Sequence, residues 1–115
     1  MSLKILGRLF TGPNDPRTAV VRHNHPPAVF AVIDKAGQAW DPEFRLIDLG
    51  DTAGATVVFA QHPDLGRWMA EAKGKLTIYL HVPDADDGDA TAQRRALVET
   101  IRANWPPGGL ISTAR

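Results

Sequence analysis

Frequent proline and glycine residues most limit what this chain can fold into. Nine prolines and ten glycines are spread over 115 residues and divide the chain into short segments. Proline lacks a backbone N–H, and both residue types favour turns, so we expect short strands and helices rather than long ones. The clearest breaks lie at residues 11–16, 23–27 and 106–109.

Length and composition predict one domain with one hydrophobic core. The 115 residues are close to the commonest domain size, and 43% apolar and 23% charged residues are ordinary for a globular protein. The absence of cysteine excludes disulfides, thiolate zinc sites and cysteine nucleophiles. No apolar run approaches the ~20 residues of a membrane span. Lys4 and Arg8 interrupt the N-terminal apolar stretch, which makes a poor signal peptide. We therefore expect a cytoplasmic protein without membrane contact.

The charge balance argues against a dedicated nucleic-acid-binding protein. Thirteen Lys and Arg residues offset thirteen Asp and Glu residues, so the formal net charge is zero. Phosphate contacts supply most of the affinity of nucleic-acid-binding proteins, which usually carry a basic excess. Any DNA binding is therefore expected to be weak and to depend on a local basic surface.

Alternation and turn signals predict the local structure. Strands are expected at residues 3–10, 18–22, 28–34, 44–49 and 75–82, and helices at 64–73 and 89–105. The strands 28–34 and 44–49 are expected to pair as a hairpin, with a turn signal at 35–38. Residues 53–61 fit either a strand or a helix. In 75–82 the apolar residues alternate with Thr77, Tyr79 and His81, as in a strand buried on one face.

This order of elements predicts an α+β fold with a small, mainly antiparallel β-sheet flanked by helices. We expect residues 1–115 to form a single domain. Its N-terminal part, 1–27, holds one or two strands and a proline-rich loop, and its core spans 28–109.

The predicted helix 89–105 carries a carboxylate in a distinctive setting. Its core face consists of Leu97, Val98, Ile101 and Trp105. Glu99 instead lies in a stripe of alanines, whose small side chains leave room for a metal, a water or another chain. The alternative is a surface ion pair between Glu99 and Arg95 or Arg102.

Several motifs within 28–109 follow one another in an order that resembles the GIY-YIG nuclease superfamily. Ala28-Val29-Phe30 stands where that family has its first tyrosine motif, and Asp48-Leu49-Gly50 stands at the second. The family's later features are matched in order by Gly50-Asp51-Thr52, by His62 and Trp68, by the arginine-rich helix 94–99 with its glutamate, and by the aromatic-proline exit at 104–107. The resemblance implies a GIY-YIG-like α+β core.

The resemblance also implies metal-dependent cleavage of phosphodiesters. In the family a glutamate holds a divalent metal, a tyrosine region activates water and an arginine stabilises the developing charge. By position, the catalytic residues are Phe30, Asp48 and Glu99, and Glu99 would hold Mg²⁺ or another divalent metal. The arginines that share its helix are the expected nucleic-acid-binding residues: Arg94, Arg95 and Arg102.

Departures from the family pattern predict an impaired active site. Phe30 lacks the tyrosine hydroxyl, Asp48 replaces the second tyrosine, and Val58 occupies the position of the helical arginine. Loss of one electrostatic stabiliser of this kind typically costs ~10²–10³ in rate. The leading hypothesis is therefore a catalytically impaired GIY-YIG-like domain that is associated with nucleic acid or acts as an interaction module.

Two alternatives remain open. The first is a protein-interaction or assembly module without a nucleic-acid role, anchored by Trp40, Trp68 or Trp105. The second is a weakly active, metal-dependent endonuclease.

Three further groups of polar residues invite a functional or a structural interpretation. Tyr79 could supply a missing hydroxyl or only cover a sheet face. The alternating histidines His23 and His25 could hold a metal together with His62 or His81, or only belong to a loop. The acidic residues within 84–89 lack the spacing of a calcium-binding loop and fit the N-cap of the last helix.

Overall fold

The computed structural model describes residues 2–5, 8–22, 26–38, 40–52, 56–82, 90–104 and 109–111. Within them, a six-stranded antiparallel sheet has the order β1-β2-β7-β4-β5-β8, and a separate strand pair joins β3 to β6. The elements are β1 (Ser2–Ile5), β2 (Arg8–Asn14), β3 (Val20–Val21), β4 (Val29–Gln38), β5 (Asp41–Asp51), β6 (Val57–Val58), the 3₁₀ helix η1 (Phe59–Gln61), α1 (Leu65–Glu71), β7 (Lys75–His81), α2 (Ala90–Asn104) and β8 (Gly109–Ile111). The predicted α+β class is confirmed.

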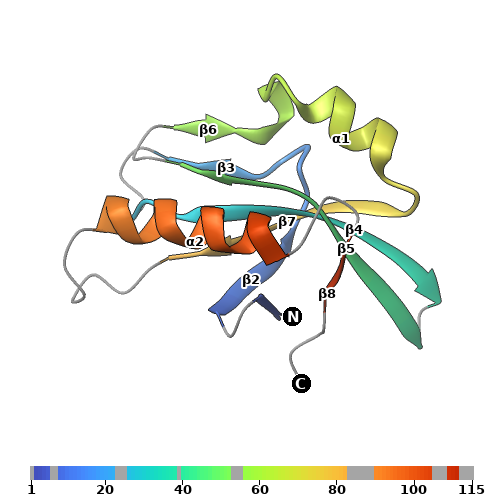
Figure 1. The fold of residues 1–115 in the computed structure, drawn as a ribbon. Helices are drawn as coiled ribbons and strands as arrows, with labels where there is room; N and C mark the ends of the chain where they lie inside the picture. The colour runs from blue at the N-terminus through green and yellow to red at the C-terminus, as the bar shows by residue number, and fades with distance from the viewer. Residues whose placement is uncertain are drawn as a thin grey trace.

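The central strand β4 contributes to two hydrophobic cores, because its side chains alternate between the faces of the sheet. Val29, Ala31 and Ile33 pack in the core that α2 covers. Phe30 and Val32 pack in the core that η1 and α1 cover. The two helices therefore lie on opposite faces of the sheet, as Figure 1 shows.

The sheet is curled. Its two outermost strands, β1 and β8, contact each other although they stand at opposite ends of the strand order. The curl brings Leu3, Ile5 and Phe10 into the same core as Val98 and Ile101 of α2. The predicted core face of this helix is thus confirmed for Leu97, Val98 and Ile101, and Trp105 lies outside the described residues.

Two of the expected elements were wrong in their boundaries. Within the expected strand 3–10, residues 3–5 and 8–10 belong to two antiparallel strands, with Leu3 opposite Phe10, because the apolar residues of both strands face one core. Residues 35–38 do not form a turn. They continue β4 alongside β5 to the pair Gln38–Asp41, and Gly37 provides the positive φ of 81° within this extension.

The β7 strand is buried on both faces, so the prediction of a half-buried strand was wrong. Ile78 packs in the core under α1, and Tyr79 packs in the core under α2. Thr77 is also buried, and its hydroxyl donates to the Ile33 carbonyl at 3.1 Å. The alternating pattern did not reveal the burial of the second face, because threonine and tyrosine can hydrogen-bond their hydroxyl groups while the rest of the side chain is buried.

The segments that the sequence left least certain form the small second sheet. Within the expected strand 18–22, only Val20 and Val21 pair, and their partners are Val58 and Val57 of β6. In the ambiguous stretch 53–61, residues 57–58 form a short strand and residues 59–61 form one 3₁₀ turn. Residues 53–55 lie outside the described residues. The β-branched residues of this stretch decide for the strand.

An extra residue in β5 sets the orientation of its second half. Ile33 pairs with Leu46, whereas the preceding Val32 pairs with Asp48, so Ile47 is a bulge. The bulge turns Ile47 into the core under α1, and it places Asp48 opposite Val32 on that same face.

Neither helix in the described part of the chain has the length and apolarity that a membrane span requires.

Candidate functional site

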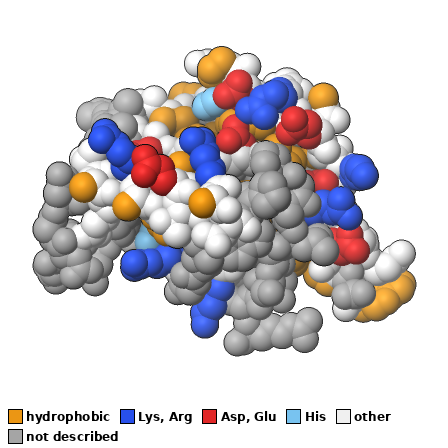
Figure 2. Space-filling view, viewed as in Figure 1, with side chains coloured by type: hydrophobic (Ala, Val, Ile, Leu, Met, Phe, Trp, Pro, Cys, Tyr) orange, Lys and Arg blue, Asp and Glu red, His pale blue; other side chains and the backbone are white. Residues whose placement is uncertain are grey.

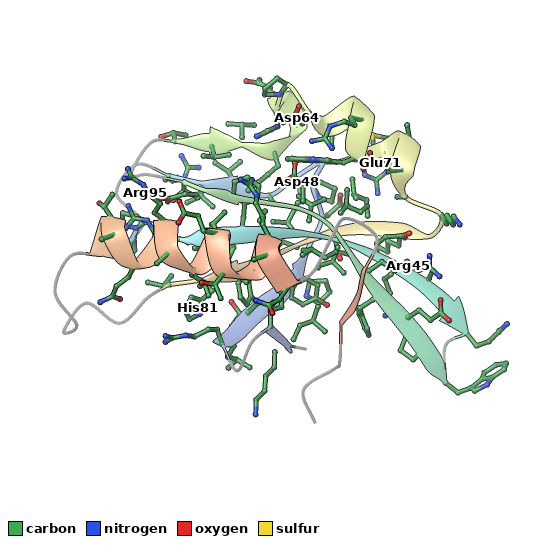
Figure 3. All side chains as sticks on the ribbon, viewed as in Figure 1. Arg45, Asp48, Asp64, Glu71, His81 and Arg95 are labelled. Carbon is green, nitrogen blue, oxygen red and sulfur yellow. The ribbon has the colours of Figure 1, made fainter. Side chains whose placement is uncertain are left out.

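A pocket of about 320 Å³ opens on the α1 side of the sheet, beside the end of β5. Its lining includes Phe30, Asp48, Gly50, His62, Trp68 and Arg102. They come from β4, β5, the segment before α1, α1 itself and α2, so five separate stretches of chain meet here. Figure 3 labels two of the acidic residues of this region, Asp64 at the beginning of α1 and Asp48 below it.

Asp48 lies at the centre of the hydrogen-bond network of the pocket. One carboxylate oxygen, Oδ2, accepts the indole N–H of Trp68 at 2.9 Å and Nη2 of Arg67 at 2.8 Å. The other, Oδ1, accepts the Leu49 backbone N–H at 2.8 Å. Burial by itself raises the pKa of Asp48, but these three hydrogen bonds and the Arg67 charge outweigh it and lower the pKa. Asp48 is thus an ionised anchor rather than a general base.

Phe30 and Gly50 form a close contact beside Asp48. Gly50 lies directly opposite Phe30 in the strand pair, and a Cβ at position 50 would come within 2.2 Å of Phe30 Cζ. Only glycine therefore leaves room for the ring at this place. The ring continues into an aromatic cluster, with its centroid 5.1 Å from that of Phe59 and 6.2 Å from that of Trp68.

The fold sets the tautomer of the neutral His62 ring. Its ring stacks on Trp68, with centroids 4.4 Å apart and the planes inclined by 29°. Nδ1 accepts the Asp64 backbone N–H at 3.1 Å, which places the proton of the neutral ring on Nε2. The stacking and this hydrogen bond fix the ring at the wall of the pocket, where Nε2–H is a donor.

Two arginines reach Asp48 from different helices. Arg67 of α1 bonds it directly and also lies 3.8 Å from Asp64 and 3.7 Å from Glu71, so three carboxylates surround this guanidinium. The contact with Asp48 also raises the pKa of Arg67. Figure 2 shows this mixture of acidic and basic side chains over α1, with a histidine beside it.

Arg102 of α2 is the cation on the pocket wall itself. Its Nη2 donates to the Leu49 carbonyl at 2.9 Å and lies 3.9 Å from Asp48 Oδ1, while 60% of the side chain stays exposed. Within the described residues, its Nε and Nη1 have no bonded partner. Arg102 is therefore anchored at one end and can still donate to a ligand.

The other two predicted phosphate contacts are placed differently. Arg94 is only 4% exposed, and its Nε donates to Asp51 Oδ1 at 2.7 Å, which ties α2 to the end of β5. Arg95 is exposed, and Figure 3 shows it nearer the beginning of α2, apart from Asp48. Of the three arginines, the structure brings only Arg102 to the lining of the pocket.

Glu99, the predicted metal ligand, is exposed on α2 and is not among the residues that line the pocket. Neither of the alternative ion pairs, with Arg95 or Arg102, forms among the described residues. The described part of the chain also has no group of three histidine or acidic side chains arranged to hold a metal. Among these described residues, Glu99 therefore belongs to no such group.

The remaining polar candidates lie elsewhere. Tyr79 is buried in the core on the other face of the sheet, where burial raises its pKa. His81 lies opposite Val29, on that same face, and its Nδ1 is 2.9 Å from the Leu9 carbonyl oxygen. It is thus separated from His62 by the sheet. His23 and His25, and the acidic residues within 84–89, lie outside the described residues.

Two contacts at and beside the pocket could not be read from the sequence. Arg67 follows a glycine and precedes Trp68, and only the fold brings the pair to Asp48, 19 and 20 positions earlier. The Asp51–Arg94 pair spans 43 positions. The one available signal was the acidic residue Asp48 between the apolar residues Ile47 and Leu49, because a carboxylate that is partly buried requires a hydrogen-bond donor.

Neither a family model, a curated protein nor a solved structure matched this chain in the comparisons made.

Proposed function

We propose that this chain is a GIY-YIG-like domain in which the nuclease centre has become a non-catalytic contact site for nucleic-acid phosphates. One observation carries the proposal. Phe30, Asp48 and Gly50, which stand at the two tyrosine motifs, line one pocket together with His62 and Trp68. All five were singled out from the order of motifs alone, and separate stretches of chain supply them.

The order of elements supports the same proposal. The hairpin of β4 and β5 is followed by η1 and α1, by β7 on the free side of β4, and by α2. The hairpin, the first helix and the later glutamate-bearing helix thus follow one another in the order that the resemblance implies.

The chemistry of the pocket supports binding without catalysis. The Phe30 ring packs against Gly50 and has no hydroxyl to activate water. The Asp48 carboxylate already accepts three hydrogen bonds and has a lowered pKa, so it is a poor proton acceptor. Val58 pairs with Val20 in the small sheet and supplies no charge.

Arg102 supplies the cation that position 58 lacks. Its exposed guanidinium and the Nε2–H of His62 are two donors on the lining of one pocket, an arrangement that suits a phosphate oxygen. Because the net charge of the chain is zero, we expect weak binding with a shallow salt dependence that reflects few phosphate contacts.

The test is fluorescence anisotropy with labelled single-stranded and duplex DNA over a series of salt concentrations. Arg102→Ala is expected to weaken binding and to lower the slope of log K against log salt by about one, since one phosphate contact is lost. Arg8→Ala, which removes an exposed arginine from β2, is the matched control and should change neither quantity beyond a nonspecific effect.

A plasmid-nicking assay with Mg²⁺ accompanies the binding measurement, and no nicked product is expected. If Arg102→Ala and Arg8→Ala bind DNA equally well, the pocket is not the phosphate site. If the wild-type chain nicks the plasmid and Arg102→Ala does not, the domain has kept its catalysis.

A further inference from the structure

Trp40 is the most exposed large apolar residue of the described chain. Its exposed fraction is 81%, whereas Trp68 is fully buried. It lies at the connection of β4 and β5, next to their last pair, Gln38 and Asp41. An indole in this position loses contact with water only when another molecule covers it.

The hairpin that carries Trp40 extends beyond the rest of the sheet. The pairing of β4 with β7 ends at Lys35, and the pairing of β5 with β8 ends at Phe44. Between these positions the two strands pair only with each other, and Figure 1 shows them projecting from the body of the molecule. Three residues from Lys35 to Gln38 advance a strand by roughly 10 Å, so Trp40 stands clear of the surface.

A second pocket, of about 210 Å³, lies between α1 and the beginning of β7. Leu65, Met69, Ala72 and Leu76 give it an apolar lining, and Met69 is 57% exposed there. This volume is below the ~300–1,000 Å³ typical of pockets for drug-sized ligands. It suits a single large side chain.

The charges beside the tip and beside the pocket are complementary. Glu43 follows Trp40 on the projecting part of β5, its Oε2 lies 3.4 Å from Nη2 of Arg45 in the same strand, and half of its side chain is still exposed. Lys75 and Arg17 line the pocket, and Lys75 is exposed. Arg17 already pairs with Asp15 at 3.1 Å, which leaves Lys75 as the principal cation toward a partner.

The pocket also lies beside the root of the hairpin of its own chain. Lys75 pairs directly with Lys35, the last residue of β4 that has two neighbouring strands. A tip and a pocket that adjoin on one chain can engage the same pair on a second chain around a two-fold axis, so both contacts form at once.

We propose that a second copy of this chain occupies the pocket, with Trp40 of each protomer inserted against the apolar lining of its partner and Glu43 beside the partner's Lys75. Each buried indole removes about 150–250 Å² of its own surface from water. Two such contacts fall short of the ~1,200 Å² of a stable interface, so the dimer is weak and depends on concentration. This inference uses neither the Arg102 pocket nor nucleic acid and stands apart from the function proposed above.

Sedimentation velocity of the full chain, from micromolar to near-millimolar concentration, tests the proposal. The wild-type mass is expected to rise from one chain to two. Trp40→Ala should weaken the dimer by at least about a hundredfold, since an anchor is lost twice. Leu9→Ala is the matched control, because Leu9 is 47% exposed on β2, away from both surfaces, and it should dimerise like the wild type.

An exchange of the charges at Glu43 and Lys75 tests separately whether the pocket of a second copy receives Trp40. Glu43→Lys and Lys75→Glu should each weaken the dimer by about tenfold, because each places like charges together twice. The double variant should regain most of the affinity. Both residues are exposed, so these changes leave the core intact. A wild-type chain that stays monomeric throughout, an unaffected Trp40→Ala variant, or a double variant weaker than both single ones would overturn the proposal.

Discussion

The indole N–H of Trp68 donates to the Asp48 carboxylate across 2.9 Å, and this bond joins α1 to β5. It arises because the bulge at Ile47 turns Asp48 toward α1, where Trp68 is the largest fully buried side chain. The bond satisfies both partners in a region that is mainly apolar. The Asp48–Trp68 pair is therefore both the floor of the candidate site and a link in the fold.

Asp48 should make the stability of the domain sensitive to acid. Its pKa is lowered in the folded chain, so its ionised form contributes stability that is fully present above the ordinary carboxyl pKa of about 3.9 and is lost as the pH falls through the lowered folded pKa. Asp48→Asn should therefore lower the free energy of unfolding near neutral pH, and the difference from wild type should shrink below about pH 4. Urea unfolding across pH measures this. Asp64→Asn, at a half-exposed carboxylate of the same pocket, is the control, and a difference that stays constant down to pH 2 would contradict the prediction.

Gly50 should not tolerate a side chain, because a Cβ would come within 2.2 Å of the Phe30 ring. Gly50→Ala is expected to destabilise the fold by about 1–3 kcal/mol, as overpacking does in well-packed cores. Gly66→Ala is the matched control. A Cβ at position 66 in α1 meets nothing within 4 Å, so this change should stabilise by roughly 0.5–1 kcal/mol through helix propensity. Thermal unfolding of both variants decides the matter, and equal shifts would show that the Phe30 ring moves aside freely.

Arg94 should act on stability rather than on nucleic-acid binding. It is 4% exposed and donates to Asp51 at 2.7 Å and to Thr91 at 3.3 Å, so Arg94→Ala breaks a largely buried ion pair together with its second hydrogen bond, at a cost of about 3 kcal/mol. The neighbouring Arg95→Ala removes an exposed guanidinium and should stay within about 0.5 kcal/mol of wild type. Chemical denaturation measures both variants. Comparable stability of the two would mean that the Asp51–Arg94 pair does not hold α2 to the sheet.

Local patterns revealed the sheet but not the contacts that close it. The apolar strands 28–34 and 44–49 predicted the β4–β5 hairpin, since alternation and β-branched residues act over a few positions. Asp34 is the last residue of the expected strand 28–34. In the structure its two oxygens accept the backbone N–H groups of Lys73 at 2.9 Å and Gly74 at 2.8 Å, 39 and 40 positions away. Such long-range acceptors leave no periodic trace in the sequence.

Only part of the candidate site could be predicted from the sequence, because its long-range contacts likewise leave no periodic pattern. The order of motifs selected Phe30, Asp48 and His62, which do share one pocket. Spacing along α2 could not distinguish Arg94 from Arg102, because both belong to one helix and their surroundings come from β5. The bulge at Ile47 decides which carboxylate faces α1, and a single extra residue in a strand has no clear sequence signal.

Glu99 remains the residue on which a metal-dependent reaction would rest, and titration calorimetry with Mg²⁺ and Mn²⁺ tests it. An exposed carboxylate that belongs to no group of three histidine or acidic side chains among the described residues should bind these ions no more tightly than ordinary surface carboxylates do. Wild type and Glu99→Ala are therefore expected to give the same weak heats without saturation at millimolar metal. The matched control is Glu71→Ala, which removes a half-exposed carboxylate from α1. Saturable binding that Glu99→Ala abolishes and Glu71→Ala keeps would show that α2 does hold a metal, and the nicking assay would then have to be repeated with that ion.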